Sequence, residues 1–349
     1  MPDIEPFSPR GMLHEGWTAQ VNDYAIACGW SMKGEIFNVG DVGGGLYAFE
    51  GTKGELIWVN ENVHHGGLLE MSINPDGDIL ATSGQDGVVI FRNCRDGKEM
   101  NKLQLGKGWV EHLKWSPDGK YLAIAFSKIV YVYNSSGDKI WCSEEHPSTV
   151  SDLAWSNKNE LATSCYGQVA FFDITNNKVN QKLEWQGSLV SMVISPSGDI
   201  VACGSQDNSV HFWRRSTGHD AEMTGYPSKP TNLSFDQSGT LLATGGSERV
   251  TVWSFVGNGP EGTIPGELGH HTEPVTSLSF SHKEKLIASG SRDGSVVVSF
   301  LQSDGQGNPV GAAFAGDHIS TIAWRPDDCA LAAVCSKGFI HVWPFKLRE

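Results

Sequence analysis

The clearest absences in this chain are a membrane span and a secretory signal. None of its apolar runs reaches about 18 residues, the length that a membrane-crossing helix needs. The first ten residues, MPDIEPFSPR, contain no apolar core after a positively charged region. We therefore expect a cytoplasmic protein that has no membrane partner.

Cysteines are few and carry no pairing pattern. Their number is odd and no two have CxxC spacing; they are Cys28, Cys94, Cys142, Cys165, Cys203, Cys329 and Cys335. Most fall inside apolar segments, which favours buried free thiols in a reducing compartment over disulfides.

Positive charge is scarce as well. The 26 lysines and arginines face 40 aspartates and glutamates, which gives a net charge of −14, and no basic run reverses this balance locally. Such a balance repels phosphate backbones and anionic surfaces. We expect no nucleic-acid partner.

The common motifs of nucleophilic and metal-dependent catalysis are also missing. The chain has no GxSxG, no GxxxxGK[ST], no HExxH and no GxGxxG that opens a helix. The glycines at 43–45 precede a strand-like segment and are interpreted as a turn. We predict that the protein is not an enzyme and has no cofactor, with a divalent metal as the one exception considered below.

What the chain does contain is one pattern repeated eight times. Each copy has an apolar strand that ends in an aromatic or aliphatic anchor residue, then a polar turn and a second apolar strand. The anchors are Trp30, Ile73, Trp115, Trp155, Ile194, Phe235, Phe280 and Trp324, spaced by 43, 42, 40, 39, 41, 45 and 44 residues. A period near forty with several short strands per unit is typical of a β-propeller.

The third unit illustrates the strands that each copy predicts. An SPDG turn at 116–119, with Pro at its second position and Gly at its last, separates predicted strands at 110–115 and 121–126. Two further strands are expected at 129–133 and 139–142. No segment has a sustained helical period, so the class is all-β.

We therefore predict an eight-bladed β-propeller of four-stranded antiparallel blades, with seven blades plus an irregular unit as the alternative. Because the repeat spans almost everything, residues 1–349 are interpreted as one domain. The last unit lacks a fourth strand, while the first has surplus residues before it. We expect the segment near Arg10–Trp17 to supply the missing outer strand and close the ring.

The repeat resembles the WD-repeat β-propeller family over essentially the whole chain. Its strongest copies are LATSGQDGVVIF (80–91), VACGSQDNSVHFW (201–213), LLATGGSERVTVW (241–253) and LIASGSRDGSVVV (286–298). The resemblance implies a scaffold that binds other proteins through the loops of one face.

The match departs from the family at the position after the third strand that is usually Trp. Trp213, Trp253 and Trp343 keep it, whereas Phe49, Arg92, Tyr133, Phe172 and Ser299 do not. The family often joins His, Ser/Thr, Asp and Trp in one hydrogen-bonded set, and no blade here has all four. We expect stability to depend more on packing between blades than on these sets.

Histidines recur just before the inner strands of the predicted blades. They are His64, His65, His146, His270, His271 and His318. A metal site at the mouth of the channel is one interpretation. The favoured one is that each His bonds its own blade, since the spacing is that of the repeat.

A second group lies three residues before successive anchors, on the strands expected to line the channel. There, Glu70, His112 and Asp152 are predicted to form an acidic–imidazole arc that could hold a divalent metal. Hydrated polar residues in a wet channel are the plainer interpretation.

Aromatic residues occupy the connecting loops where other blades place His. Trp109, Trp185 and Tyr226 do so, and Arg92 is expected near the same face. Trp, Tyr and Arg are enriched at binding hot spots, although each could instead fill a gap between blades. We assign the partner-binding surface to Trp109, Trp185, Tyr226, Arg92, His65 and His271.

Two Gly- and Pro-rich insertions, 256–269 and 301–316, are expected to be hairpin loops on the opposite face. From all these features we predict a non-catalytic scaffold that docks protein partners on its loop face. The alternative is a propeller that binds a metal or small ligand in its channel.

Overall fold

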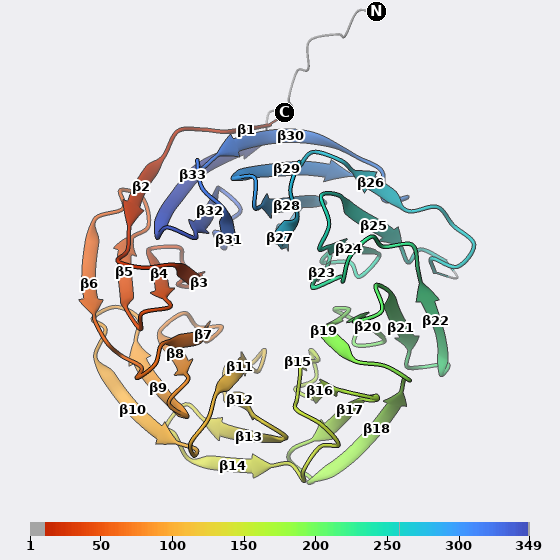
Figure 1. Ribbon diagram of the computed structural model, residues 1–349, viewed down its shortest axis with the longest axis horizontal. Helices are drawn as coiled ribbons and strands as arrows, with labels where there is room; N and C mark the ends of the chain where they lie inside the picture. The colour runs from red at the N-terminus through yellow and green to blue at the C-terminus, as the bar shows by residue number, and fades with distance from the viewer. Residues whose placement is uncertain (1–10, 258, 348–349) are drawn as a thin grey trace, which may run out of the picture.

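The strands of this protein are arranged as blades around a central opening (Figure 1). The structure, a computed structural model, describes residues 11–257 and 259–347. Within these residues the chain forms eight antiparallel sheets; seven are built from four strands consecutive in sequence, and the eighth joins the last three strands of the chain to its first two. The prediction of an all-β, eight-bladed propeller is confirmed, and the alternative of seven blades is wrong.

Each blade has an inner, a second, a third and an outer strand. The inner strands, which surround the opening, are β3 (Ala25–Trp30), β7 (Leu68–Ile73), β11 (Val110–Trp115), β15 (Asp152–Trp155), β19 (Leu189–Ile194), β23 (Asn232–Phe235), β27 (Val275–Phe280) and β31 (Ile319–Trp324). The second strands are β4 (Ile36–Asp41), β8 (Ile79–Gly84), β12 (Tyr121–Phe126), β16 (Leu161–Cys165), β20 (Ile200–Ser205), β24 (Leu241–Gly245), β28 (Leu286–Ser291) and β32 (Ala330–Cys335).

The third strands are β5 (Leu46–Glu50), β9 (Val88–Asn93), β13 (Ile129–Asn134), β17 (Gln168–Asp173), β21 (Val210–Arg214), β25 (Val250–Ser254), β29 (Ser295–Leu301) and β33 (Phe339–Leu347). The outer strands of the first seven blades are β6 (Leu56–Asn60), β10 (Glu99–Gln104), β14 (Lys139–Cys142), β18 (Lys178–Glu184), β22 (His219–Met223), β26 (Gly266–Leu268) and β30 (Gly307–Phe314). Each anchor residue of the sequence repeat is therefore the last residue of an inner strand.

In the first seven blades, the residue after the anchor is short and polar, and its side chain bonds to the backbone of the turn. Ser116 Oγ accepts a hydrogen bond from Tyr121 N at 3.0 Å, and Asn74 Oδ1 accepts one from Ile79 N at 2.9 Å. Gly119 then takes φ 69°, a conformation that favours glycine. This side-chain bond to the backbone explains why the turns of the repeat are recognisable in the sequence.

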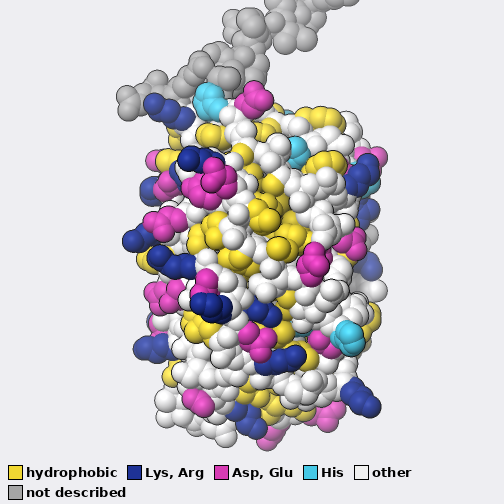
Figure 2. All heavy atoms as spheres, turned by 90° about the vertical axis from the view of Figure 1, so that its left-hand side faces the viewer, with side chains coloured by type: hydrophobic (Ala, Val, Ile, Leu, Met, Phe, Trp, Pro, Cys, Tyr) yellow, Lys and Arg dark blue, Asp and Glu magenta, His cyan; other side chains and the backbone are white. Residues whose placement is uncertain are grey.

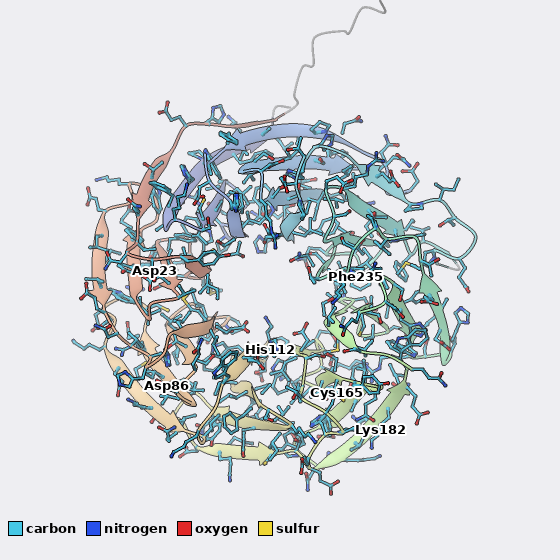
Figure 3. The ribbon with its side chains drawn as sticks, viewed as in Figure 1. Asp23, Asp86, His112, Cys165, Lys182 and Phe235 are labelled. Atoms are coloured by element: carbon cyan, nitrogen blue, oxygen red, sulfur yellow. The ribbon has the colours of Figure 1, made fainter. Side chains whose placement is uncertain are left out.

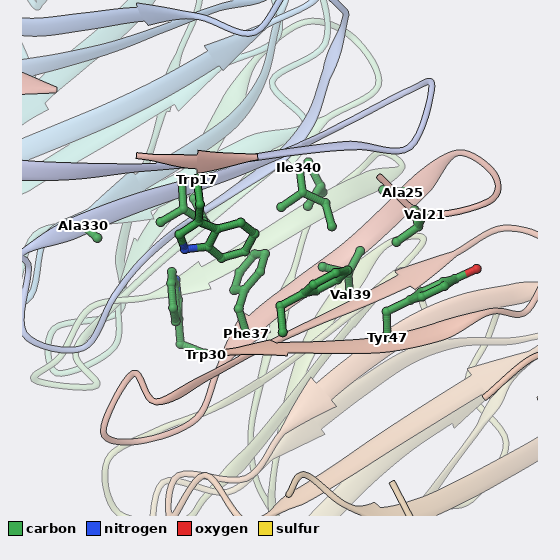
Figure 4. Close-up of a cluster of buried hydrophobic side chains, with 13 residues drawn as sticks. Trp17, Val21, Ala25, Trp30, Phe37, Val39, Tyr47, Ala330 and Ile340 are labelled. Carbon is green, nitrogen blue, oxygen red and sulfur yellow. The ribbon is translucent and has the colours of Figure 1, made fainter. Parts of the chain in front are cut away.

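The hydrophobic core is divided among the joints between blades. Each of the eight clusters of buried side chains draws on two neighbouring blades. The cluster between the last and first blades, for example, packs Trp17 and Ile340 against Phe37 and Val39 (Figure 4). Neighbouring blades are thus stacked like the sheets of a sandwich, in a closed series.

The ring is closed by the beginning of the chain, as predicted. Both β1 (Gly11–Leu13) and β2 (Trp17–Gln20) pair with β33, with Leu13 opposite Phe345 and Trp17 opposite Val342. Of the expected segment, Arg10 lies outside the described residues, and the pairing extends beyond Trp17 to Gln20.

The closing strand is interrupted where it meets a proline. His14 N donates to Pro344 O at 2.8 Å, whereas Pro344 has no N–H to return. A Cβ added at Gly16 would lie 1.9 Å from Val342 O, so only glycine fits this approach. The break between β1 and β2 follows from these two residues.

One predicted insertion has a different structure. Residues 255–257 and 259–265 do lie between the strands β25 and β26, but half of 301–316, Gly307–Phe314, forms the strand β30. The prediction of a hairpin loop over 301–316 is therefore wrong. Gly311, Ala312 and Ala313 pair with residues of β29, and only a short turn separates the two strands.

Candidate functional site

The two faces of the ring carry different connections. The loops from each outer strand to the next inner strand meet the turns between second and third strands; Leu105 N, for example, donates to Gly87 O at 3.0 Å. We call this the loop face. The opposite side, which carries the remaining turns of each blade, is called the turn face.

Most of the exposed aromatic side chains among the described residues lie on the loop face, on different blades. Trp109, between β10 and β11, is 55% exposed, and Tyr166, in the turn from β16 to β17, is 61% exposed. Phe314, at the end of β30, is 70% exposed. Tyr24 and Phe339 are further exposed aromatics of this face. Of these, only Trp109 was a candidate from sequence.

The other exposed aromatics were missed because they stand outside the connecting loops that contain Trp109. Tyr166 occupies a turn where the strong repeat copies have the polar sequences QDG, QDN, SER or RDG. An aromatic side chain does not stabilise such a turn, whereas Asp, Asn and Gly do so through local hydrogen bonds or backbone conformation. Its presence there was a signal in the sequence that could have identified it.

Two of the aromatic residues predicted to bind a partner instead make contacts within the propeller. Trp185 is half-buried and stacks on His211 with ring centroids 3.8 Å apart. Tyr226 is half-buried too, and its hydroxyl accepts hydrogen bonds from Trp253 Nε1 at 2.7 Å and Thr244 Oγ1 at 3.1 Å. Burial raises the pKa of Tyr226 to about 12. Both residues fill gaps between strands, which was the alternative interpretation.

The candidate His271 is likewise part of a blade. It is 7% exposed, with Nδ1 2.7 Å from Ser295 Oγ and Nε2 2.7 Å from Ser289 Oγ. Burial lowers its pKa despite the nearby Asp293. The carboxyl of Asp293 has a pKa of about 2, because hydrogen bonds from Ser295 and Thr272 N outweigh the effect of burial.

The second blade has the same arrangement, with His64 in the buried position rather than the candidate His65. The ring nitrogens of His64 lie 3.2 Å from Asp86 Oδ1 and 2.9 Å from Thr82 Oγ1. His65 is exposed, and its backbone N donates to Asp86 Oδ2 at 2.9 Å. Its side chain is free to face solvent on the loop face.

The expectation that Arg92 lies near the same face is wrong. Arg92 is at the far end of β9, where its Nη1 donates to Gly97 O at 3.0 Å in the turn before β10. It is 8% exposed, and its second contact is with Glu99, 3.5 Å away. A third strand ends at the turn face, so the residue in the usual Trp position lies there.

In the channel, the structure brings Glu70 and His112 together but adds a lysine to them. His112, on the inner wall of the ring (Figure 3), has Nδ1 3.6 Å from Glu70 Oε2. Lys114 Nζ lies 3.4 Å from Glu70 Oε1. Lys114 was missed because only the position three residues before each anchor was compared, whereas side chains two residues apart share a face of a strand.

The predicted metal-binding arc does not form. Asp152 Oδ2 accepts a hydrogen bond from Met192 N at 2.8 Å, on the next inner strand, and Oδ1 accepts one from Leu153 N. Within residues 11–257 and 259–347, no group of three His, Cys, Asp or Glu side chains could hold a metal ion. Glu70, His112 and Asp152 therefore belong to a mixed-charge cluster whose carboxylates already have partners.

The charges in this cluster shift one another's proton affinities. Burial opposes the protonation of His112, but Glu70 and Asp152 outweigh it and raise the pKa of His112. Glu70 raises the pKa of Lys114. Burial acts to raise the pKa of Glu70 as well, yet Lys114 and His112 hold it below its ordinary value. Burial does raise the pKa of Asp152.

The fold is that of a β-propeller, and its loop face carries exposed aromatic side chains of a kind that suits contacts with other molecules. Three segments match the family model of the WD domain, G-beta repeat: residues 59–93, 178–214 and 262–298. Each begins in or just before an outer strand and ends in the third strand of the next blade. The chain is thus an eight-bladed β-propeller in which three segments are similar to WD repeats.

Three curated relatives cover more of the chain than these segments do. B-type cell cycle switch protein ccs52A of Medicago truncatula is 24% identical over 71% of this chain and 54% of its own length. Cell division cycle 20.6, cofactor of APC complex, of Arabidopsis thaliana is 26% identical over 56% of this chain and 50% of its own length. Small ribosomal subunit protein RACK1 of Drosophila melanogaster is 22% identical over 50% of this chain and 53% of its own length. The chain thus spans about half the length of these relatives.

Among solved structures, the computationally designed Ika8 protein is similar along nearly the whole chain. The similarity has a TM-score of 0.79 and covers 95% of this chain and 98% of that one. Because the two sequences are only 19% identical, this comparison concerns the fold alone.

Proposed function

We propose that this protein is a non-catalytic interaction scaffold that docks protein partners on its loop face. The observation that carries the proposal is the set of exposed aromatic side chains there, with Trp109, Tyr166 and Phe314 each more than half exposed. Aromatic residues on a rigid surface give contact area at little cost in conformational entropy. The names of two relatives, a cofactor of the APC complex and a small ribosomal subunit protein, support a role within a larger assembly.

The proposed partners are proteins, and the proposed location is the cytoplasm. All seven cysteines are free thiols, and those at 94, 165, 203 and 335 are buried, which supports a reducing compartment. The net charge of −14 supports partners other than nucleic acids and anionic membranes. The described part of the chain has no helix that could cross a membrane.

A pull-down from native lysate, quantified by mass spectrometry, tests the proposal. The variant to compare is Trp109→Ala with Tyr166→Ala, since both side chains are mostly exposed and their loss leaves the blades intact. Ile264→Ala is the matched control, because Ile264 is 88% exposed but lies in the loop between β25 and β26, on the turn face. We expect a partner that the wild type and the control capture and the double variant loses. A partner retained by the double variant, or none captured at all, would contradict a loop-face scaffold.

A further inference from the structure

The outer strands of a propeller are sheet edges, and most of them here carry features that discourage further pairing. Exposed edges are protected in natural proteins by charges, prolines, short strands or breaks. β14 and β18 contain lysines, β22 contains Asp220, and β30 contains Pro309. β10 and the short β26 also carry charges, and the closing strand is broken between β1 and β2.

β6 differs from these strands. Its sequence, LIWVN, contains no charged residue and no proline. Leu56, Ile57 and Val59 are 56%, 45% and 44% exposed, so three of its five residues present apolar side chains to solvent. Figure 2 views the side of the molecule on which β6 lies, and hydrophobic side chains gather near the centre of that view.

β6 is also held firmly in place. Trp58 Nε1 donates to Cys94 O at 3.0 Å, and Asn60 Nδ2 donates to Gly97 O at 3.2 Å, both in the turn of the second blade. Side chains at alternate positions face opposite ways, so Ile57 and Val59 point away from those contacts. In the described structure β6 pairs only with β5, which leaves its other edge free. A rigid, apolar strand edge is suited to accept an additional strand.

The charges at the two ends of β6 indicate what kind of strand would fit. Glu55 and Glu61 flank it, both are exposed, and neither forms an ion pair within the described residues. In the antiparallel register that pairs all of β6 with a second copy of itself, Glu55 would face Glu61 twice. Like charges directly opposite each other destabilise a strand pair. A second copy of this chain is therefore a poor occupant.

We propose that β6 accepts an extended segment of another protein as an additional strand. That segment has alternating apolar side chains at its centre and a basic residue at each end, six positions apart, to face Glu55 and Glu61. Because this site lies on the circumference of the ring, it is separate from the loop face and does not depend on the function proposed for that face. The net charge of −14 favours the approach of a basic partner.

Titration with a defined peptide tests this proposal. The probe is acetyl-Lys-Thr-Val-Thr-Val-Thr-Lys-amide, whose valines face Val59 and Ile57 when its lysines face Glu61 and Glu55. Its binding is measured by isothermal titration calorimetry or fluorescence anisotropy. We expect saturable binding to the wild type and binding weaker by about tenfold or more when the two lysines are replaced by glutamates, since each end would then face a like charge. A peptide that is N-methylated on the alternate amides facing β6 cannot donate hydrogen bonds to that strand, and we expect it not to bind.

Two lysine substitutions locate the site on the protein. Ile57→Lys places a charge on the exposed face of β6 and should weaken binding about tenfold or more. Met100→Lys makes the same change on β10, where Met100 is 52% exposed, and should leave binding unchanged. Melting temperatures confirm that both variants fold, and the N-methylated peptide tests the pairing without any substitution.

Several outcomes would overturn the proposal. They are no saturable binding of the lysine-ended peptide to the wild type, binding that survives N-methylation, and equal binding by Ile57→Lys. Analytical ultracentrifugation of the wild type provides a further one. A dimer that Ile57→Lys dissociates would mean that a second copy, and not a basic segment, occupies β6.

Discussion

Tyr226 occupies the place where the second and seventh blades have a buried histidine. Its hydroxyl accepts hydrogen bonds from Trp253 Nε1 and Thr244 Oγ1, so it joins a loop to two strands of the sixth blade. A phenol thus performs the joining role of an imidazole. The sequence marks the position by its spacing, whereas only the structure reveals the change in chemistry.

Removing this hydroxyl should destabilise the blade. In Tyr226→Phe the indole N–H of Trp253 stays half-buried without its acceptor, which should cost about 1 to 3 kcal/mol of unfolding free energy. Thermal or urea unfolding measures the loss. Tyr166→Phe is the control, because Tyr166 is 61% exposed, and its effect should be small. Equal stability of the two variants would mean that the Tyr226 hydroxyl contributes nothing to folding.

His112 should give the protein a distinctive dependence on pH. It faces Glu70, Lys114 and Asp152, and the two carboxylates raise its pKa in the folded state. A raised pKa means that its stabilising effect is complete below the ordinary value of about 6.5 and is lost as the pH rises through the folded-state pKa. Buried His64, His146 and His271 have lowered pKa values and act in the opposite sense.

Comparing the wild type with His112→Gln separates the contribution of His112 from that of the other histidines, which both proteins contain. We expect the melting temperature of His112→Gln to fall further below that of the wild type at about pH 6 than at about pH 8. Differential scanning fluorimetry across this range measures it. A difference that does not vary with pH would show that Glu70 and His112 are not coupled as the geometry implies.

At the scale of strands, the tryptophan anchors join neighbouring blades. Four inner strands end in Trp, and each indole donates to the carbonyl of the residue before the previous blade's anchor. The pairs are Trp30 with Ala323, Trp115 with Ser72, Trp155 with Lys114 and Trp324 with Ser279. The other four anchors are Ile or Phe and have no N–H to donate. The repeat that identified the fold is thus also a series of joints between blades.

Replacing one such anchor should loosen its joint. Trp155→Phe removes the 2.9 Å bond from the indole to Lys114 O and part of the ring, at a cost of about 1 to 3 kcal/mol. Chemical denaturation provides the measurement. Trp109→Phe, at an exposed position, should change stability little. If both substitutions had the same effect, the anchor bonds would contribute nothing to the contact between blades.

The elements were predictable from sequence because local chemistry determines them. Turns such as 116–119 need a short polar side chain and a glycine at fixed places, and the anchors stand one residue before them. The error over 301–316 has the opposite cause. Gly and Pro residues there indicated a loop, but pairing with β29 outweighed their weak strand propensity.

The candidate site was predictable only in part, because it depends on which side chains are buried in contacts within and between the blades. Trp109 and Tyr226 look alike in sequence as aromatics in connecting loops, yet one is exposed and the other bonds to Trp253. Lys114 contacts Glu70 because the inner strands of neighbouring blades lie side by side, which one repeat alone does not reveal. Burial and contacts between blades are properties of the assembled ring, and a single repeat does not encode them.

At the scale of the whole molecule, the described residues give no blade a core of its own. Each hydrophobic cluster is shared by two blades, so every blade is stabilised by both neighbours. Such a ring depends on being closed, because an open ring would expose the last blade's strand edge and half of a cluster. The joint between the last and first blades is therefore critical, and Trp17 lies in it, donating to Gly51 O at 3.2 Å.

Opening that joint should destabilise the entire ring. Deleting residues 1–20 removes β1 and β2 and the buried Trp17, which should lower the melting temperature by about 10 °C or more and expose the edge of β33 to self-association. Gly16→Ala tests the same joint with the chain intact, because its Cβ would lie 1.9 Å from Val342 O. Gly269→Ala is its control, since a Cβ there meets nothing within 4 Å. Calorimetry and ultracentrifugation measure both effects, and an unchanged melt for the deletion would refute closure by the N-terminal strand.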